Sequence, residues 1–380
     1  MLLIAIAGGQ IVEQDDCPPE RLNAQALPAA GMLWLSCTRD ELAQHVLAVQ
    51  AALRAWCGVE LLDLHLSDLL NPQLPSTYDY TTHYDVLVFR RLAQQPLPAA
   101  GSASAASRHT SPSLPQVETH PVGFAVFDRV LLSVHSADAS LRDAYVQRLL
   151  LAARAPEAAA LADARSVGAR GVPSHPADLM LRMISQMVDG FLALRRSLSQ
   201  QLEPWQTALL APRGHVGNWG ELLAVRQTLH TLDDVCDDQT SALQAWMAAL
   251  ASTPLADAAL DAQQRDGVQV RCRDVLEHIE RVARHVRQLE HNVEAAVQIH
   301  FSMQSHRTNE IMRTLTALTA VFLPLNLVTG IFGMNFEFIP LLHQNNGFWW
   351  ALGGMALTAG VLLTLFWRKR YLARIPRVHG

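Results

Sequence analysis

The stretch GIFGMNFEFIP, residues 330–340, closes a long uncharged run near the C-terminus of this chain. The run begins at Thr314, directly after Arg313, and ends at Phe336, directly before Glu337. It exceeds the roughly 20 apolar residues that a membrane-spanning helix needs. Such a helix usually leaves the bilayer through Trp, Tyr, Lys or Arg. Here the exit carries Gly, Met and Asn instead, which indicates a special role for this end of the span.

A second uncharged run covers residues 348–367, and we expect the two spans, 314–336 and 348–367, to form a hairpin joined by an outer loop at 337–347. The loop contains no Lys or Arg, whereas the tail at 368–380 is basic and Arg307 and Arg313 precede the first span. The positive-inside rule therefore places both termini in the cytoplasm. Trp349, Trp350 and Trp367 fit the interfacial belts of the second span.

The composition excludes several classes of protein. Charged residues make up 17% of the chain and the formal net charge is -5, so we expect no nucleic-acid partner. The five Cys are scattered without a CxxC pair, as is typical of reduced thiols in the cytosol. The apolar N-terminus, residues 2–12, lacks the basic start of a secretory signal and is predicted to be a first β-strand.

Residues 1–265 are predicted to form a cytosolic α+β domain with αβα layers. Further strands are expected at 31–37, 59–66, 84–92 and within 122–135. A helix is expected over 38–56, with Thr38 as N-cap and Glu41 completing a capping box. The Pro- and Ser-rich segment 94–120 is predicted to be a flexible insertion.

After about residue 138 the apolar spacing becomes helical, most clearly at 175–210 and 220–235. Residues 273–315 contain neither Pro nor Gly and run into the first span. We therefore predict a stalk helix at 266–313 that continues into the membrane as one helix of more than about 60 residues. A helix of this length requires a bundle or an oligomer to cover it.

A stripe of polar and apolar side chains recurs along this helix at spacings of three and four. Its members are Asn309, Met312, Thr316, Thr319, Leu323, Asn326 and Gly330. An amide in mid-span is costly in hydrocarbon unless it is paired. Asn326 is therefore predicted either to bond to a neighbouring helix or to face water, and the sequence favours neither alternative.

Two spans cannot enclose a pore, but several copies around an axis can, with the first span inside. Asn335 of each copy would then form a ring of amide oxygens at the outer mouth, and such neutral oxygens hold a cation through its water shell. Gly330 and Gly333 would permit close backbone approach there. Met312 and Leu323 would form apolar constrictions that gate by dewetting. Pro324 is predicted to be a tolerated or kinking membrane proline.

The sequence TNEIMRTLTALTAVFLPLNLVTGIFGMNFEFIP, residues 308–340, with its short loop, second span and basic tail, resembles the CorA family of divalent metal-ion transporters. The signature is Gly333-Met334-Asn335, the GMN motif that closes the first span. The resemblance is close over about residues 305–370 and weaker at 67–92.

This resemblance implies a homopentameric funnel in a bacterial inner membrane that transports Mg²⁺, with Co²⁺ and Ni²⁺ as further candidates. It implies no enzymatic activity and no organic cofactor. The implied pore positions are Asn309, Met312, Leu315, Leu323, Asn326, Gly330 and Asn335. The loop departs from the MPEL pattern of many members, because it reads Ile339-Pro340-Leu341-Leu342, so Leu341 stands where that pattern has the acid and Glu337 is the only outer carboxylate. A zinc transporter similar to the ZntB branch, with proton coupling, is the alternative.

The family also senses intracellular Mg²⁺ at acidic sites of the cytosolic domain. Asp68 lies in the matching segment, and a second candidate is the cluster of Asp233, Asp234, Asp237 and Asp238, whose like charges at i and i+4 repel. A solvated acidic face is the plainer interpretation of that cluster. The stalk histidines His278, His285, His291 and His300 are predicted to be surface residues. A membrane-anchored enzyme is disfavoured, because no phosphate loop, HExxH or nucleophile elbow is present.

Overall fold

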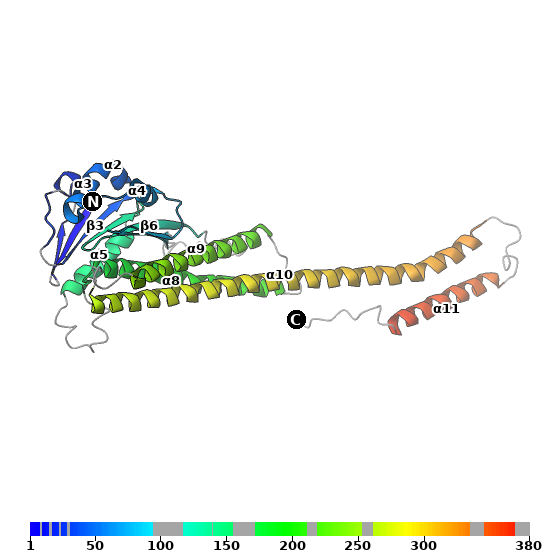
Figure 1. Ribbon diagram of the computed structural model, residues 1–380. Helices are drawn as coiled ribbons and strands as arrows, with labels where there is room; N and C mark the ends of the chain where they lie inside the picture. Colours follow the sequence, from blue (N-terminus) through cyan, green and yellow to red (C-terminus); the bar gives the residue numbers. More distant parts are fainter. Residues whose placement is uncertain are drawn as a thin grey trace. The chain divides into compact units, whose positions relative to one another are not determined.

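The computed structural model describes residues 1–7, 10–14, 17–22, 24–28, 31–93, 117–138, 140–154, 172–210, 219–252, 261–334 and 346–368. The chain divides into two units, Met1–Val293 and Glu294–Gly380. Figure 1 shows the elements of the first unit in blue to yellow and those of the second in yellow to red. Each unit is described here by itself.

The first unit is built on a seven-stranded sheet with the order β2-β1-β3-β7-β6-β5-β4. The pair β3–β7 is parallel and the other described pairs are antiparallel. The strands are β1 Leu2–Ala7, β2 Gln10–Gln14, β3 Met32–Thr38, β4 Thr77–Tyr80, β5 Asp85–Leu92, β6 Thr119–Val126 and β7 Val130–His135. The parallel pair joins segments about a hundred residues apart, since Leu33 lies opposite Val130.

Helices cover both faces of the sheet. The described helices are α1 Pro19–Leu22, α2 Arg39–Gln44, α3 Val46–Cys57, α4 Asp63–Leu70, α5 Ser140–Arg154, α8 Pro176–Leu210, α9 Trp219–Ser252, α10 Ala262–Phe332 and α11 Gly347–Arg368. Figure 1 shows α2, α3 and α4 on one face, with α5, α8 and α9 on the other. Because both faces are covered, β3 and β7 are apolar and buried along most of their length. The αβα layers and the two C-terminal apolar helices are therefore confirmed.

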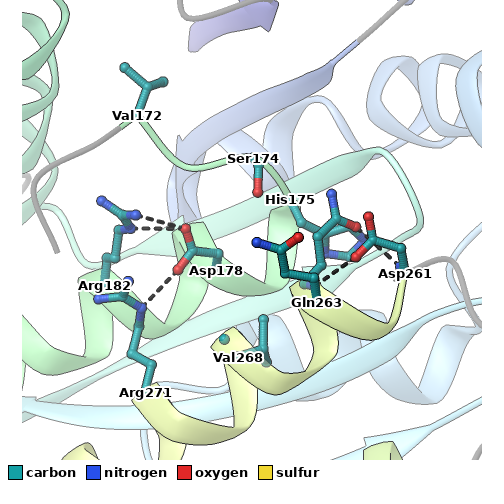
Figure 2. Close-up of a pocket in the computed structure, with 11 residues that line it drawn as sticks. Val172, Ser174, His175, Asp178, Arg182, Asp261, Gln263, Val268 and Arg271 are labelled. Atoms are coloured by element: carbon teal, nitrogen blue, oxygen red, sulfur yellow. Dashed lines mark hydrogen bonds and ion pairs between the residues drawn. The ribbon is translucent and has the colours of Figure 1, made fainter. Parts of the chain in front are cut away.

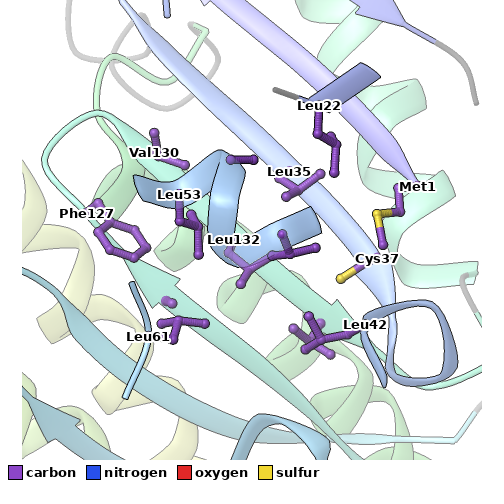
Figure 3. Packing of buried hydrophobic residues seen from close by; sticks show 14 of the residues in the cluster. Met1, Leu22, Leu35, Cys37, Leu42, Leu53, Leu61, Phe127, Val130 and Leu132 are labelled. Atoms are coloured by element: carbon purple, nitrogen blue, oxygen red, sulfur yellow. The ribbon is translucent and has the colours of Figure 1, made fainter. Parts of the chain in front are cut away.

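The core on the α2–α3 face explains why the alternate residues of β3 are apolar. Leu33, Leu35 and Cys37 of β3 lie in one buried cluster with Leu42 of α2 and Leu53 of α3 (Figure 3). Complete burial of a Leu side chain contributes about 1.5–3 kcal/mol. These contacts hold the two short helices on the sheet.

The opposite face of β3 is more polar. Trp34 packs edge-on against Tyr145 of α5, with ring centroids 5.9 Å apart. Its Nε1 donates to the Ser133 hydroxyl of β7 at 2.8 Å, and His135 Nε2 lies 2.9 Å from the same hydroxyl. Ser133 and His135 are completely buried. A polar group in such a place is retained only when it is hydrogen-bonded.

The capping box predicted at Thr38 is confirmed. The Thr38 hydroxyl accepts from the Glu41 amide at 3.2 Å, and the Glu41 carboxylate accepts from the Thr38 amide at 2.8 Å. The helix that follows does not run to residue 56 as predicted, because it breaks at His45 into α2 and α3. Each half buries its own side chains in the same core cluster, so packing on the sheet overrides the local helix pattern.

The strand predicted at 59–66 is wrong, because residues Asp63–Leu70 form α4. Leu61, His65 and Leu69 are buried at a spacing of four, whereas Leu62 and Leu64 are exposed. The alternating apolar letters suggested a strand, but burial follows the helical period. The segment before the helix is held by Gln50, whose amide group bonds to both the N–H and the C=O of Leu61.

The first predicted strand, 2–12, is two strands. β1 and β2 pair antiparallel, with Ala7 opposite Gln10, so only two residues join them. The Gly8-Gly9 dipeptide between them is a typical hairpin signal that the strand prediction overlooked. Most of the insertion predicted at 94–120 lies outside the described residues, and β6 already begins at Thr119.

The remaining predicted elements are present. Strands β3, β5, β6 and β7 occupy the predicted segments, and β4 was missed. Helices α8 and α9 cover 175–210 and 220–235, and α9 continues to Ser252. Residues 273–315 belong to the single helix α10, which has 71 residues and includes Pro324.

We predict that acid destabilises the first unit partly through His135. Burial, with the nearby guanidinium groups of Arg142, Arg91 and Arg39, lowers the pKa of His135 to about 3. In the unfolded chain the His135 imidazole binds a proton near pH 6.5. The contribution of neutral His135 to the free energy of unfolding is therefore complete above pH 6.5. It is lost between pH 6.5 and 3, by about 1.4 kcal/mol per pH unit. Denaturant titrations of the full-length protein in mild detergent, followed by tryptophan fluorescence from pH 7 to 4, measure this loss.

The variant His135→Gln keeps a hydrogen-bonding group near Ser133 but cannot titrate. Its free energy of unfolding should fall less steeply with pH than that of the wild type. An unchanged slope would assign the acid sensitivity to other groups, such as His175, whose pKa burial lowers to about 4.

Candidate ion-conduction site

The C-terminal part of α10 and the whole of α11 are long and apolar enough to cross a membrane. Their most apolar windows have mean hydropathies of 1.9 and 1.6, and only 6% and 0% of the window residues are buried. A soluble core helix of this composition would be covered by protein. Exposed apolar helices of this length are expected of segments that lipid or further copies cover.

The predicted stripe of α10 lies entirely on an exposed surface. Its residues, with the additional position Leu315, are Asn309, Met312, Leu315, Thr316, Thr319, Leu323, Asn326 and Gly330, and every one of them is exposed. At 3.6 residues per turn they share one side of the helix. The structure thus leaves this side uncovered within a single chain, and the pore assignment itself stays a prediction.

The covered residues of α10 form a different stripe. They are Arg313, Ala317, Ala320, Val321, Pro324, Leu325, Val328 and Phe332, all buried or half-buried. The mean directions of the two stripes differ by roughly 150° at 3.6 residues per turn. Helix α11 also has one half-buried stripe, formed by Ala351, Met355, Ala359, Leu362 and Phe366. Since α10 and α11 supply the described residues of this unit, the covered stripes face one another and the polar stripe points away from α11.

The threonines of the polar stripe present acceptors. The Thr316 hydroxyl donates to the carbonyl of Met312 at 2.7 Å, and the Thr319 hydroxyl donates to that of Leu315 at 2.9 Å. Because each proton is used within the helix, the oxygen lone pairs remain free on the exposed side. Such oxygens accept hydrogen bonds from the water shell of a cation.

The helix ends at the motif that opened the sequence analysis. The amide of Gly333 donates to the Thr329 carbonyl at 3.0 Å, and the amide of Met334 donates to the Ile331 carbonyl at 3.2 Å. A Cβ on Gly333 would lie 3.2 Å from the Thr329 oxygen, whereas one on Gly330 would meet nothing within 4 Å. Gly330 therefore offers bare backbone to a neighbour. Asn335 and Glu337 lie outside the described residues.

The second candidate region is the acidic cluster on α9. Arg287 of α10 donates from Nε to Asp233 at 3.0 Å and from its terminal nitrogen to Asp237 at 2.6 Å. Burial first, and then the negative charges of Asp234 and Asp237, raise the pKa of Asp238. One arginine thus neutralises two of the four carboxylates and fastens α10 to α9.

No group of three or more His, Cys, Asp or Glu side chains is arranged to hold a metal within the described part of the chain. Asp68 lies half-buried near the end of α4, where its carbonyl accepts from the Asn71 amide. The regulatory sites therefore stay predictions. Among the stalk histidines, His285 bonds to Ser199 of α8 at 2.6 Å, and a partner on another helix cannot be seen in sequence spacing.

A cavity of about 430 Å³ lies where α8 and α10 begin (Figure 2). On its wall Asp178 pairs with Arg182 of the same helix at 2.9 Å and with Arg271 of α10 at 2.8 Å. Asp261 caps α10, because its carboxylate accepts from the Gln264 amide at 2.7 Å. These contacts fix the start of α10 against α8. Sequence reasoning missed the pair of Asp178 and Arg271, since these two residues lie far apart in the chain.

Comparisons with known proteins agree with this arrangement. The family model for the CorA-like Mg²⁺ transporter protein matches residues 30–370. The cobalt/magnesium transport protein CorA of Thermotoga maritima is 34% identical over 100 residues, which are 26% of this chain and 28% of that protein. The magnesium transport protein CorA of Haemophilus ducreyi is 26% identical over 52% of this chain and 60% of its own length. The chain thus aligns with less than two thirds of these relatives.

Two solved structures have the same fold over nearly the whole chain. The complete CorA magnesium transporter from Methanocaldococcus jannaschii has a TM-score of 0.67 and 16% identity, and covers 97% of this chain and 98% of its own. The full-length CmaX protein has a TM-score of 0.62 and 17% identity, with 97% of each chain covered. At this identity the likeness establishes the fold alone.

The exposed stripe generates a prediction about water access. We expect the thiol of Asn326→Cys to react with a membrane-impermeant methanethiosulfonate reagent at least tenfold faster than the thiol of Val328→Cys on the covered stripe. The measurement uses the full-length protein in liposomes. The native thiols of Cys17, Cys37, Cys236 and Cys272 are buried and give little background, and the half-buried Cys57 is replaced by Ser in both variants. Equal, slow reaction of both variants would instead favour a hydrogen bond from Asn326 to a neighbouring helix.

Proposed function

The chain belongs to the CorA-like Mg²⁺ transporter family. From that premise we propose that it conducts divalent cations, with Mg²⁺ as the main substrate, through a homopentamer in a bacterial inner membrane. Both termini would face the cytoplasm. The observation that carries the proposal is the direction of the polar stripe, which is exposed on the side of α10 away from the covered stripe.

Symmetric copies explain this exposure. A lipid-facing position for Thr316, Thr319 and Asn326 would be costly, because polar groups in hydrocarbon require a partner. If α11 lies outside and α10 inside a ring, the stripes of all copies turn toward one axis. The bare backbone at Gly330 supports a close approach of neighbouring copies near the outer end.

The chemistry of the stripe suits a hydrated dication. Mg²⁺ releases its water slowly, and the stripe offers neutral hydroxyl and amide oxygens in place of carboxylates that would trap the ion. Met312, Leu315 and Leu323 alternate with them along the stripe, and rings of such side chains would interrupt the water column when the pore narrows.

Electrostatics would supply the direction of uptake. The C-terminal end of α10 carries a partial negative charge of roughly half an elementary charge per helix, which attracts cations at the outer mouth. An inside-negative potential of 100 mV then favours entry of a dication by about 4.6 kcal/mol. The basic tail and the loop without Lys or Arg support this orientation.

Regulation is proposed at the acidic cluster of α9 and at Asp68. The carboxylates of Asp233 and Asp237 are oxygen ligands of the kind that Mg²⁺ prefers. In the single chain they are held by Arg287. Mg²⁺ binding there would have to compete with this guanidinium, which couples the ion level to the contact between α9 and α10.

We predict that Asn335→Ala abolishes Mg²⁺ uptake while the oligomer still assembles, because the ring of amide oxygens that receives the hydrated ion is lost. Uptake is measured in reconstituted liposomes with Mg²⁺, Zn²⁺ and Co²⁺ in competition, with and without a pH gradient. Asn346→Ala, an amide at the start of α11, is the matched control and should keep wild-type uptake. Normal uptake by Asn335→Ala would remove the amide ring from the mechanism.

A further prediction concerns Arg287. Arg287→Ala should enlarge the rise in melting temperature that millimolar Mg²⁺ produces, because two carboxylates lose their built-in cation. Arg284→Ala, on the same stretch of α10, is the control and should behave like the wild type. If Mg²⁺ shifts all three proteins equally, the cluster is a solvated acidic face and holds no regulatory ion.

A further inference from the structure

The cavity where α8 and α10 begin has a buried inner wall and an exposed rim (Figure 2). Its volume of about 430 Å³ lies within the range of roughly 300–1,000 Å³ that small-molecule pockets have. His175 and Val268 on its inner wall are buried, whereas Ser174 and Gln263 on its rim are exposed. A small molecule can therefore enter from solvent and reach buried groups. The cavity shares no residue with the proposed conduction path or the proposed regulatory sites.

His175 supplies a buried donor on the inner wall. Its ring caps α8, because Nδ1 accepts from the Ala177 amide at 3.1 Å. Since Nδ1 accepts, the proton of the neutral imidazole lies on Nε2. The side chain is 8% exposed, Nε2 is buried, and no described residue accepts a hydrogen bond from it. A buried N–H without an acceptor is rare in folded proteins, because it forfeits its hydration and gains nothing in return.

The His175 ring is neutral at physiological pH. Burial lowers the pKa of His175 to about 4, against weaker opposing effects of the Asp178 carboxylate and the Asp128 backbone. The Nε2–H donor is therefore present in one form at neutral pH. An oxygen atom of a ligand would satisfy it by accepting its hydrogen bond.

The charged side chains of the cavity balance one another. Arg182 and Arg271 carry the positive charges, and both bind Asp178, at 2.9 and 2.8 Å. The second negative charge belongs to Asp261, whose carboxylate accepts from the Gln264 amide at 2.7 Å. Both carboxylates are thus occupied by groups of the protein, and the cavity offers neither of them to a metal ion.

Two helix N-termini then give the cavity an excess of positive charge. Helix α8 begins at Pro176 and has 35 residues, and α10 begins at Ala262 and has 71 residues. The N-terminus of such a helix is equivalent to roughly half an elementary positive charge. Because the side-chain charges cancel, the excess is about one positive charge. A ligand with a single negative charge would balance it.

We propose that this cavity binds a small organic anion that carries one carboxylate and several hydroxyl groups. The carboxylate would accept the hydrogen bond of the His175 Nε2–H and lie near the two helix N-termini. The side-chain amides of Gln263 and Gln264 and the hydroxyl of Ser174 line the same cavity and suit the hydroxyl groups of the ligand. A phosphate monoester fits less well, because its charge of about −1.5 to −2 at neutral pH exceeds the positive excess.

The test measures the melting temperature of the full-length protein in mild detergent without added divalent cations, followed by tryptophan fluorescence. Sodium gluconate, a carboxylate on a polyhydroxy chain, should raise it saturably, because a ligand that contacts both α8 and α10 stabilises the folded state. Sorbitol, which has the hydroxyl groups but no carboxylate, should not. Sodium chloride at equal ionic strength should not either.

Two variants test whether gluconate binds in this cavity. His175→Asn keeps an N-cap oxygen for the Ala177 amide but loses the Nε2–H donor, and it should raise the half-saturating gluconate concentration at least tenfold. Gly267→Leu places a side chain beside the cavity, where an added Cβ meets nothing within 4 Å. It should fold at least as stably as the wild type, because Leu favours a helix more than Gly does, and show the same loss. Val270→Leu, an exposed position of α10 outside the lining, is the control and should bind gluconate normally.

Three outcomes would overturn the proposal. The first is equal stabilisation by gluconate, sorbitol and chloride. The second is unchanged gluconate binding by Gly267→Leu, a result that does not depend on whether the His175 variant folds. The third is saturable competition by sodium phosphate at concentrations equal to or below that of gluconate, which would assign the cavity to a more highly charged anion.

Discussion

A polar side chain in the middle of a bilayer must have either a partner or water, and this constraint determines how the C-terminal unit can be understood. Hydrocarbon provides no hydrogen bonds, so a helix that carries Thr316, Thr319 and Asn326 on one side cannot leave that side to lipid without a large cost. In the single chain the covered stripe of α10 lies elsewhere, toward α11. In the proposed function, further copies of the chain cover the polar side and a wet axis lies between them.

Polar contacts hold the N-terminal part of α10 to its neighbours in the first unit. Arg271 binds Asp178, Arg287 binds Asp233 and Asp237, and His285 bonds to Ser199. Ion pairs near a surface are weak and respond to salt and to competing cations. The helix that bears the candidate conduction stripe is thus attached to its neighbours by contacts whose strength depends on the ionic conditions of the surrounding solution.

Local signals in the sequence predicted local structure well. The capping box at Thr38 depends on two residues three positions apart and was found, and the long helix was found because 273–315 lacks Pro and Gly. The strand predicted at 59–66 was wrong, because an alternating pattern of apolar residues does not reveal which side chains the fold will bury. The prediction of one helix over 38–56 missed the break at His45 for a related reason, since the packing of α2 and α3 on the sheet decides where the helix breaks.

In the candidate site, too, local features could be predicted from the sequence and tertiary contacts could not. The spacing along one helix sufficed to predict the polar stripe, because its members share a helix face by geometry alone. The partner of Asp233 could not be predicted, since Arg287 lies more than fifty positions away in the chain. Such pairs become visible only when the tertiary fold brings distant segments together.

The parallel contact between β3 and β7 has a consequence for biosynthesis. Central strands separated by about a hundred residues cannot join until the later one has left the ribosome, so the sheet forms late compared with a simple hairpin protein. The seven strands of the described sheet nevertheless all precede the apolar segments in the chain. During translation the sheet can therefore be completed while the hydrophobic helices are still inside the ribosome or unsynthesised, and the order of the chain separates folding of the sheet from membrane insertion in time.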